Sequence, residues 1–91
     1  MEKLFLEYMD LNCDLKQSSK KHYAGAIKTI SKEMSKEGII SKNLYDVTSY
    51  SEFLKMKELI ENNEKFLQKD KRGGRMYSVA LYHYSNFLRC K

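Results

Sequence analysis

The sequence predicts an all-α fold, a compact bundle of four to five helices in one domain. Proline is absent and glycine occurs only 4 times in 91 residues, which argues against a turn-rich β-sandwich. Apolar side chains recur at helical spacing, and no segment alternates with a period of two for long enough to form a sheet. With 42% hydrophobic residues, 7 Tyr and 4 Phe, the chain can fill one core and is too apolar to be disordered.

The first predicted helix covers residues 2 to about 12. Its apolar side chains fall near helical spacing: Leu4, Phe5, Tyr8, Met9 and Leu11. It ends at the weak helix formers Asn12, Cys13 and Asp14.

The second predicted helix is the longest, with about 20 residues or roughly 30 Å. Ser18 or Ser19 is the expected N-cap, and Gly38 is expected just past the end in the left-handed conformation. One face carries Tyr23, Ile27, Ile30 and Met34, and a second line carries Lys28, Lys32 and Lys36. The small residues at positions 24–26 allow a neighbouring element to approach closely.

A connector at residues 39–47 should turn Ile40, Leu44 and Tyr45 inward before a third helix. Ser49 and Glu52 have the capping-box spacing that starts this helix. Its stripe is Phe53, Met56, Leu59 and Ile60, and the Asn pair at 62–63 interrupts it. Residues 64–69 should form a short fourth helix or helical turn.

The loop at residues 69–75 combines two glycines with four cations and precedes a last helix over about 75–89. That helix has an apolar stripe of Met76, Val79, Ala80, His83, Tyr84, Phe87 and Leu88. We interpret His83 as a packed core residue with one hydrogen bond, not a catalytic group. The predicted core is Tyr23, Ile27, Ile30, Met34, Phe53, Ile60, Val79, Ala80 and Phe87.

The sequence lacks the motifs that are typical of several classes of function. No apolar run approaches the roughly 20 residues of a membrane span, and the first residues lack a signal-peptide core, so we expect a cytoplasmic protein without a membrane partner. Cys13 and Cys90 are expected as free thiols. We find no phosphate-binding loop, no nucleophile elbow and no set of four zinc ligands, and expect neither enzymatic activity in this chain nor a metal or other cofactor.

The charge of the chain alternates in blocks within an overall net charge of +5. Residues 1–15 and 44–64 each carry a net charge of −3, whereas residues 16–43 carry +5 and residues 65–91 carry +6. If the two basic blocks share a face, they form a positive surface suited to a phosphate backbone. The alternative is that the lysines only solvate helix surfaces.

Two clusters within these blocks place cations, short hydroxyls and tyrosine at the start of a predicted helix. Helix N-termini present free N–H groups and a positive dipole end to phosphate. The candidate DNA-binding residues are Lys16, Ser18, Ser19, Lys20, Lys21 and Lys28 in the first cluster and Lys71, Arg72, Gly73, Gly74, Arg75, Tyr77 and Ser78 in the second. Each cluster taken alone could also be an ordinary capped, solvated helix start.

Four segments share a helical pattern with a known family: residues 5–9, residues 15–23 with the Ala26, Ile27 and Ile30 stripe, the Leu44-Tyr45-Asp46-Val47-Thr48 segment, and residues 76–88. Together they resemble the SAM-like core-binding domain of tyrosine recombinases. Residues 63–66, 71–74 and 77–88 are also similar to helical segments that precede effector domains in bacterial restriction proteins of the HNH and McrB-like kind. The resemblance implies a SAM-like DNA-binding domain at the N-terminal side of a longer protein, with the catalytic residues in a separate domain.

The sequence therefore predicts that residues 1–91 form a single DNA-binding or adaptor domain. The expected partner is double-stranded DNA, bound with little sequence preference so that a separate recombinase or restriction domain is positioned on it. The alternative is a protein-interaction or oligomerisation module that uses exposed tyrosines, for which Tyr50, Tyr77 and Tyr82 are the candidates.

Overall fold

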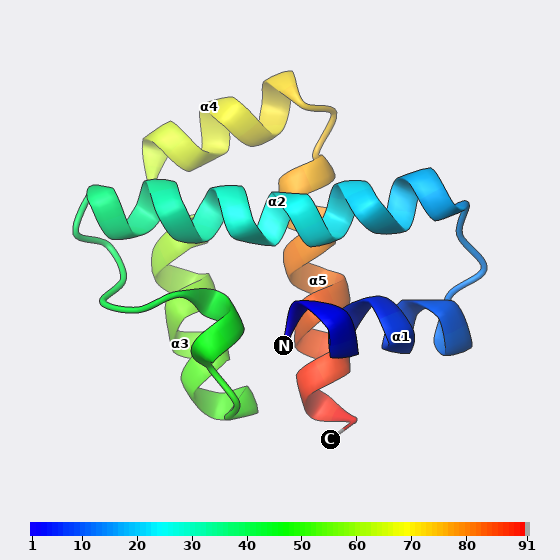
Figure 1. The fold of residues 1–91 in the computed structure, drawn as a ribbon. Helices are drawn as coiled ribbons and strands as arrows, with labels where there is room; N and C mark the ends of the chain where they lie inside the picture. Colours follow the sequence, from blue (N-terminus) through cyan, green and yellow to red (C-terminus); the bar gives the residue numbers. More distant parts are fainter. Residues whose placement is uncertain (91) are drawn as a thin grey trace.

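A computed structural model describes residues 1–90 and confirms the all-α fold (Figure 1). Its elements in order are α1 (Glu2–Asn12), α2 (Gln17–Lys36), the 3₁₀ turn η1 (Leu44–Asp46), α3 (Tyr50–Glu61), α4 (Glu64–Arg72) and α5 (Met76–Arg89). The described residues contain five α-helices and no strand. Among these helices none has the length and apolar character that a membrane crossing requires.

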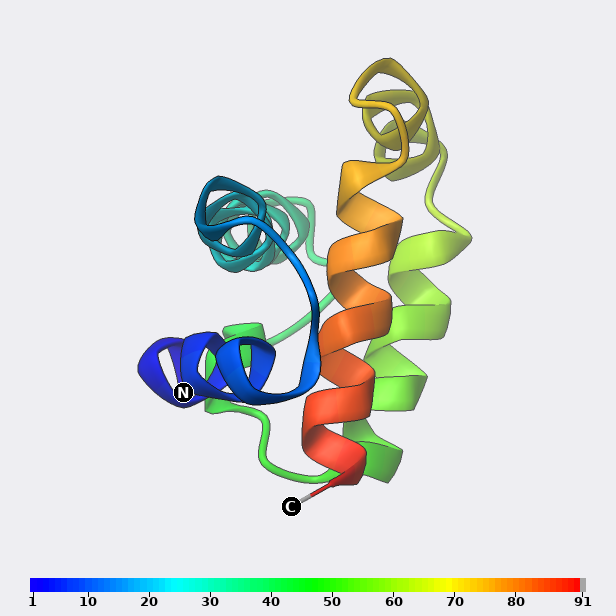
Figure 2. The ribbon, with the colours of Figure 1, turned by 90° about the vertical axis from the view of Figure 1, so that its right-hand side faces the viewer.

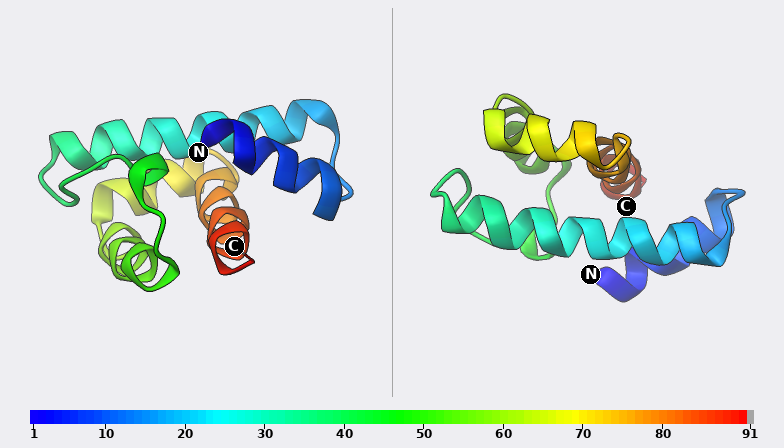
Figure 3. Two further views of the ribbon diagram at one scale, coloured as in Figure 1. Left: turned by 60° about the horizontal axis from the view of Figure 1, so that its bottom comes forward. Right: turned by 90° about the horizontal axis from the view of Figure 1, so that it is seen from above.

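The five helices form two crossing layers. Helices α3 and α5 run side by side, and α2 crosses them, as Figures 1 and 2 show. Helix α1 lies on the same side as α2 and packs against α2 and α5. Helix α4 runs beside the C-terminal half of α2 at the opposite edge of the molecule from α1 (Figure 3). Helix α5 contacts all four other helices and is therefore the centre of the bundle.

Tyr84 of α5 is the hub of the core. Its side chain is fully buried, and its ring centroid lies 5.1 Å from those of Phe5 and Phe53 and 5.5 Å from that of Tyr45. Its hydroxyl donates a hydrogen bond of 3.0 Å to the Leu44 carbonyl. Because an unsatisfied buried carbonyl is costly, this bond fixes the connector against α5.

The predicted core is confirmed except at two positions. Ile27, Ile30, Met34, Phe53, Ile60, Ala80 and Phe87 are buried. Tyr23 and Val79 are only half-buried, as is His83, whereas Leu81 and Ser85 are buried. The prediction assumed one stripe on α5, but this helix is packed on several sides and buries a wider face.

Local signals at the helix ends are mostly confirmed. The Ser49 hydroxyl accepts from the Glu52 N–H at 3.3 Å, and Asn63 caps α4 by accepting from the Phe66 N–H at 3.1 Å. Gly38 follows α2 with φ +75°, the left-handed conformation predicted for it. Small residues in α2 do admit a neighbour, since Ala24 is buried and its carbonyl accepts from the Tyr45 hydroxyl at 2.6 Å.

Two boundaries differ from the prediction. Helix α2 begins at Gln17 with Lys16 as N-cap, because Lys16 already has an extended backbone with φ −67° and ψ 150°. Ser18 and Ser19 therefore lie inside its first turn and do not cap it. Helix α4 continues to Arg72, which shortens the predicted loop at 69–75 to a turn.

Candidate nucleic-acid interface

The first basic cluster lies at the start of α2, and most of its side chains reach solvent. Lys16, Ser18 and Lys21 are exposed and Ser19 is half-buried. No side chain caps this end and no acidic residue lies in its first turn. The first N–H groups of α2 and its positive dipole end therefore remain open toward an anion.

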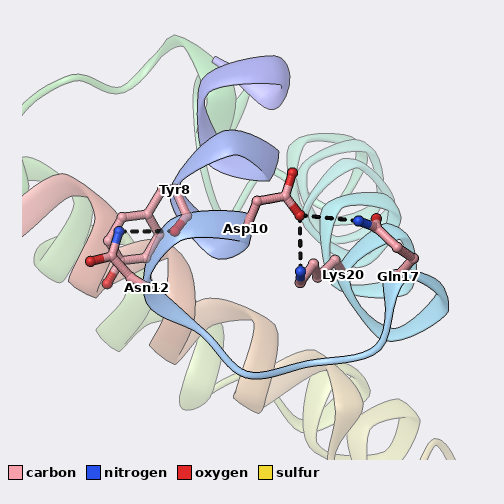
Figure 4. Close-up of polar contacts among 5 residues, drawn as sticks. All are labelled: Tyr8, Asp10, Asn12, Gln17 and Lys20. Atoms are coloured by element: carbon pink, nitrogen blue, oxygen red, sulfur yellow. Dashed lines mark hydrogen bonds and ion pairs between the residues drawn. The ribbon is translucent and has the colours of Figure 1, made fainter.

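Lys20 does not belong to the exposed surface, contrary to the prediction. It is only 7% exposed, because it shares the inner face of α2 with Ala24 and Ile27. Its ammonium group lies 2.9 Å from Asp10 Oδ1 of α1, and Gln17 donates to the same oxygen at 3.3 Å (Figure 4). The hydrogen bond from Lys20 lowers the pKa of the Asp10 carboxyl. Lys20 therefore joins α1 to α2.

Lys28 is exposed but has an acidic partner. Its Nζ lies 3.1 Å from Glu2 Oε1 of α1. Both side chains are well solvated, so this ion pair is weak and open to competition from a phosphate. Lys28 is therefore a weaker candidate for binding a phosphate than Lys16 and Lys21.

The second cluster surrounds the tight turn between α4 and α5. Lys71 and Arg72 form the exposed end of α4, and the chain reverses through Gly73, Gly74 and Arg75. Gly74 and Arg75 both have positive φ, +64° and +66°. The Arg75 N–H donates to the Asp70 carbonyl at 2.7 Å, which closes the turn. The turn holds three exposed cations within five residues.

The start of α5 is already capped, which differs from the expected open helix start. Asp70 is 7% exposed, and its Oδ1 accepts from the Ser78 N–H at 2.8 Å. A carboxylate at a helix N-terminus satisfies the backbone donor and the helix dipole in the same way as a phosphate. The second cluster can therefore contribute cations, whereas its helix end is not available to an anion.

Tyr77 and Ser78 have structural partners in this cluster. The Ser78 hydroxyl donates to the Arg75 carbonyl at 3.1 Å. The ring of Tyr77 lies against Gly73, where an added Cβ would come 3.2 Å from its Cε2, and Lys69 lies 5.4 Å from the ring centroid. Both side chains are half-buried, so their roles in the turn come before any role in binding.

The two clusters lie in different layers of the fold but can be seen from the same side. Figure 2 looks onto that side, with the start of α2 at mid-height in one layer and the α4–α5 turn at the top of the other layer, above the first half of α5. Five cations of these clusters are exposed and have no carboxylate partner within the described residues; they are Lys16, Lys21, Lys71, Arg72 and Arg75. We call these five residues the basic end.

A groove of about 640 Å³ between α2 and α4 adjoins the basic end, and no sequence pattern predicted it. Met34, Phe66 and Tyr77 supply its apolar surface. Two ion pairs bridge it, Lys69 to Glu33 at 2.5 Å and Lys65 to Glu37 at 2.7 Å. These partners are 28 and 36 residues apart, so no local pattern could have revealed the groove.

Both cysteines are free thiols in the structure, and Cys13 lies next to His83. Cys13 Sγ lies 3.8 Å from His83 Nδ1, and the Tyr23 ring centroid lies 5.2 Å from that of His83. Burial raises the pKa of the Cys13 thiol and lowers the pKa of His83. A neutral thiol beside a neutral imidazole is not an activated nucleophile. Within residues 1–90 no group of three possible ligands could hold a metal ion.

The comparisons with known proteins return no match: no family model fits the chain, and neither a curated protein nor a solved structure resembles it. Nothing in them identifies a recombinase core-binding domain or a restriction protein, and that resemblance stays a prediction.

Proposed function

We propose that this chain binds double-stranded DNA through the basic end. The observation that carries the proposal is that two clusters, about 50 residues apart in sequence, present five exposed and unpaired cations on one side of the fold. Lys3, Lys32, Lys36, Lys55 and Arg89 are also exposed without a carboxylate partner among the described residues, but they are spread over α1, α2, α3 and α5, and Lys42, Lys57 and Lys65 have such partners. Cations without partners can neutralise phosphates without first breaking an ion pair.

Binding of this kind should depend little on the base sequence. Lysine ammonium groups contact phosphates as point charges and release condensed counterions. Five such contacts would give a slope of log affinity against log salt of about −4 to −5. Arg75 is the residue best suited to read a guanine edge, because arginine can donate two hydrogen bonds to one guanine and Gly74 leaves open space beside it. We also propose that the domain positions a separate catalytic domain on the DNA. This second part of the proposal rests on the resemblance alone.

The test is a binding titration on a labelled duplex between about 50 and 200 mM salt. We expect Lys71→Ala/Arg72→Ala and Lys16→Ala/Lys21→Ala each to weaken binding at low salt and to make the slope less negative by about 2, since each phosphate contact contributes about 1. Arg75 is kept in both variants because it is the candidate for reading a guanine edge, so that the variants remove only phosphate contacts.

The control variant is Lys55→Ala/Arg89→Ala, which removes the same net charge. Both residues are exposed, lack a carboxylate partner within the described residues and lie outside the two clusters. If this control weakens binding as much as the cluster variants do, net charge alone accounts for binding and the basic end is not a site.

Protein interaction remains the second candidate function, and one observation favours it. Of the three candidate tyrosines, Tyr82 is exposed at 59%, whereas Tyr50 and Tyr77 are half-buried. The observation that favours an interaction is instead on α1, where Leu4 and Leu11 are 48% and 85% exposed.

A further inference from the structure

Helix α4 is attached to the rest of the fold by few buried side chains. Of its nine residues only Phe66 and Asp70 are buried, and the helix lies at an edge of the molecule (Figures 1 and 2). Its main packing contacts are with α3 and α5, and the groove of about 640 Å³ lies between it and α2. Because an isolated helix of this length is unstable in water, α4 keeps its helical shape only while it is docked.

Two ion pairs connect α4 to α2 across the groove. Glu33 and Glu37 are one turn apart on α2, and their partners Lys69 and Lys65 are one turn apart on α4, so the two pairs lie side by side. All four side chains are at least one-third exposed. Exposed ion pairs contribute little to stability, because water solvates both partners when the pair separates. The connection between α4 and α2 is therefore easily broken.

Asp70 makes the segment that follows α4 depend on this helix. Its carbonyl accepts from the Arg75 N–H at 2.7 Å, and its Oδ1 accepts from the Ser78 N–H at 2.8 Å. When α4 leaves its place, both N–H groups lose these acceptors. The turn at residues 73–75 and the first turn of α5 should therefore open together with α4.

The centre of the core is built from other elements. The ring of Tyr84 packs against Phe5 of α1, Tyr45 of η1 and Phe53 of α3, and its hydroxyl donates to the Leu44 carbonyl. These contacts do not involve α4, so they persist when α4 moves. The second half of α5 is therefore anchored independently of its first turn.

We propose that residues 64–78 form a flap that opens as one unit, is held closed in part by the two ion pairs to α2, and leaves the rest of the fold intact. Proteins open in such cooperative units at free energies below that of global unfolding. The flap carries Lys71, Arg72 and Arg75, so its opening changes where the second basic cluster lies relative to the first. A partner that contacts this cluster only in the closed flap would shift the equilibrium toward closure. The proposal concerns the free protein and does not depend on DNA binding.

Native-state hydrogen exchange, followed by NMR at several low urea concentrations, tests the flap in the natural chain. We expect the amides of α4, Arg75 and Ser78 to share one opening constant that is at least about tenfold larger than those of Ile30 in α2 and Tyr84 in α5. Its logarithm should depend less on urea, because opening the flap exposes less surface than unfolding the whole chain. A common opening constant and urea dependence for all these amides would overturn the proposal, and so would Arg75 and Ser78 amides that do not follow α4.

A charge variant tests the role of the ion pairs. Glu33→Gln/Glu37→Gln should raise the opening constant of the flap by about 2- to 30-fold, the range expected for the loss of two exposed ion pairs. The matched control is Glu7→Gln/Glu58→Gln, which removes the same charge from two exposed positions outside the described ion pairs and should leave the opening constant unchanged. Equal opening constants in the two variants would show that the ion pairs do not hold the flap.

A second variant removes the apolar anchor of the flap. The loss of an anchor can cost no more free energy than undocking the flap, because the chain can undock the flap instead. We therefore expect Phe66→Ala to remove protection at α4, Arg75 and Ser78 while the Ile30 amide stays protected. Phe53→Ala, which removes a ring packed on the core, should lower the protection of Ile30 as well. Unfolding of the whole chain by Phe66→Ala would show that the flap is not an independent unit.

Discussion

At the scale of single residues, His83 is the side chain whose environment most clearly sets a pH dependence. It is half-buried, with Cys13 Sγ at 3.8 Å and the rings of Tyr23 and Tyr82 at 5.2 and 5.6 Å. Burial lowers the pKa of His83 below its usual value of 6.5. No carboxylate lies against the ring, so nothing in the described fold compensates a charged imidazolium.

The folded state should therefore lose stability as the pH falls through about 6.5, because the unfolded chain binds a proton that the folded chain resists. We expect the urea midpoint to fall between about pH 7.5 and 5 and the fall to be smaller in His83→Gln, which cannot take the proton. His22→Gln, at an exposed position, is the control and should behave like the natural chain. Equal falls in His83→Gln and the natural chain would show that His83 is not responsible.

At the scale of elements, the junction of α4 and α5 depends on one carboxylate. Asp70 belongs to α4, yet its Oδ1 caps α5 through the Ser78 N–H at 2.8 Å, and its carbonyl closes the turn. A buried cap that is removed leaves a backbone donor without a partner. The cap therefore sets where α5 begins and how the basic turn is held.

We predict that Asp70→Ala lowers the free energy of unfolding by about 0.5–2 kcal/mol, the range for loss of a helix cap. Asp70→Asn should cost less, because its amide oxygen can still accept the hydrogen bond. Urea unfolding measures both, and Glu58→Ala, which removes an exposed carboxylate from α3, should change stability by less than about 0.5 kcal/mol. If Asp70→Ala matches Glu58→Ala, the cap does not stabilise the junction.

The contrast between Ser49 and Asp70 shows which part of an element the sequence can predict. The cap at Ser49 is local, three residues from its partner, and the spacing alone revealed it. Asp70 bonds eight residues away across a turn, and its burial depends on how α4 meets α5. Periodicity likewise located every helix, but it could not give the buried face of α5, which is set by its neighbours.

The candidate site, too, could be predicted only in part. Its cations could be identified from the charge blocks, because the number of cations in each block is read directly from the sequence. Which of them stay free is decided by tertiary contacts, such as Lys20 with Asp10 and Lys28 with Glu2. The presence of residues 16–21 and 71–75 on one side of the fold also depends on the crossing of α2 over α5 (Figures 1 and 2).

At the scale of the whole molecule, the candidate site depends on how the two layers cross. Helix α2 begins at one edge of the fold, and the α4–α5 turn lies at the top of the other layer (Figures 1 and 2). A duplex of about ten base pairs is roughly 34 Å long, comparable to the 33 Å longest dimension of one copy. Such a duplex is therefore long enough to contact both clusters of one copy at once.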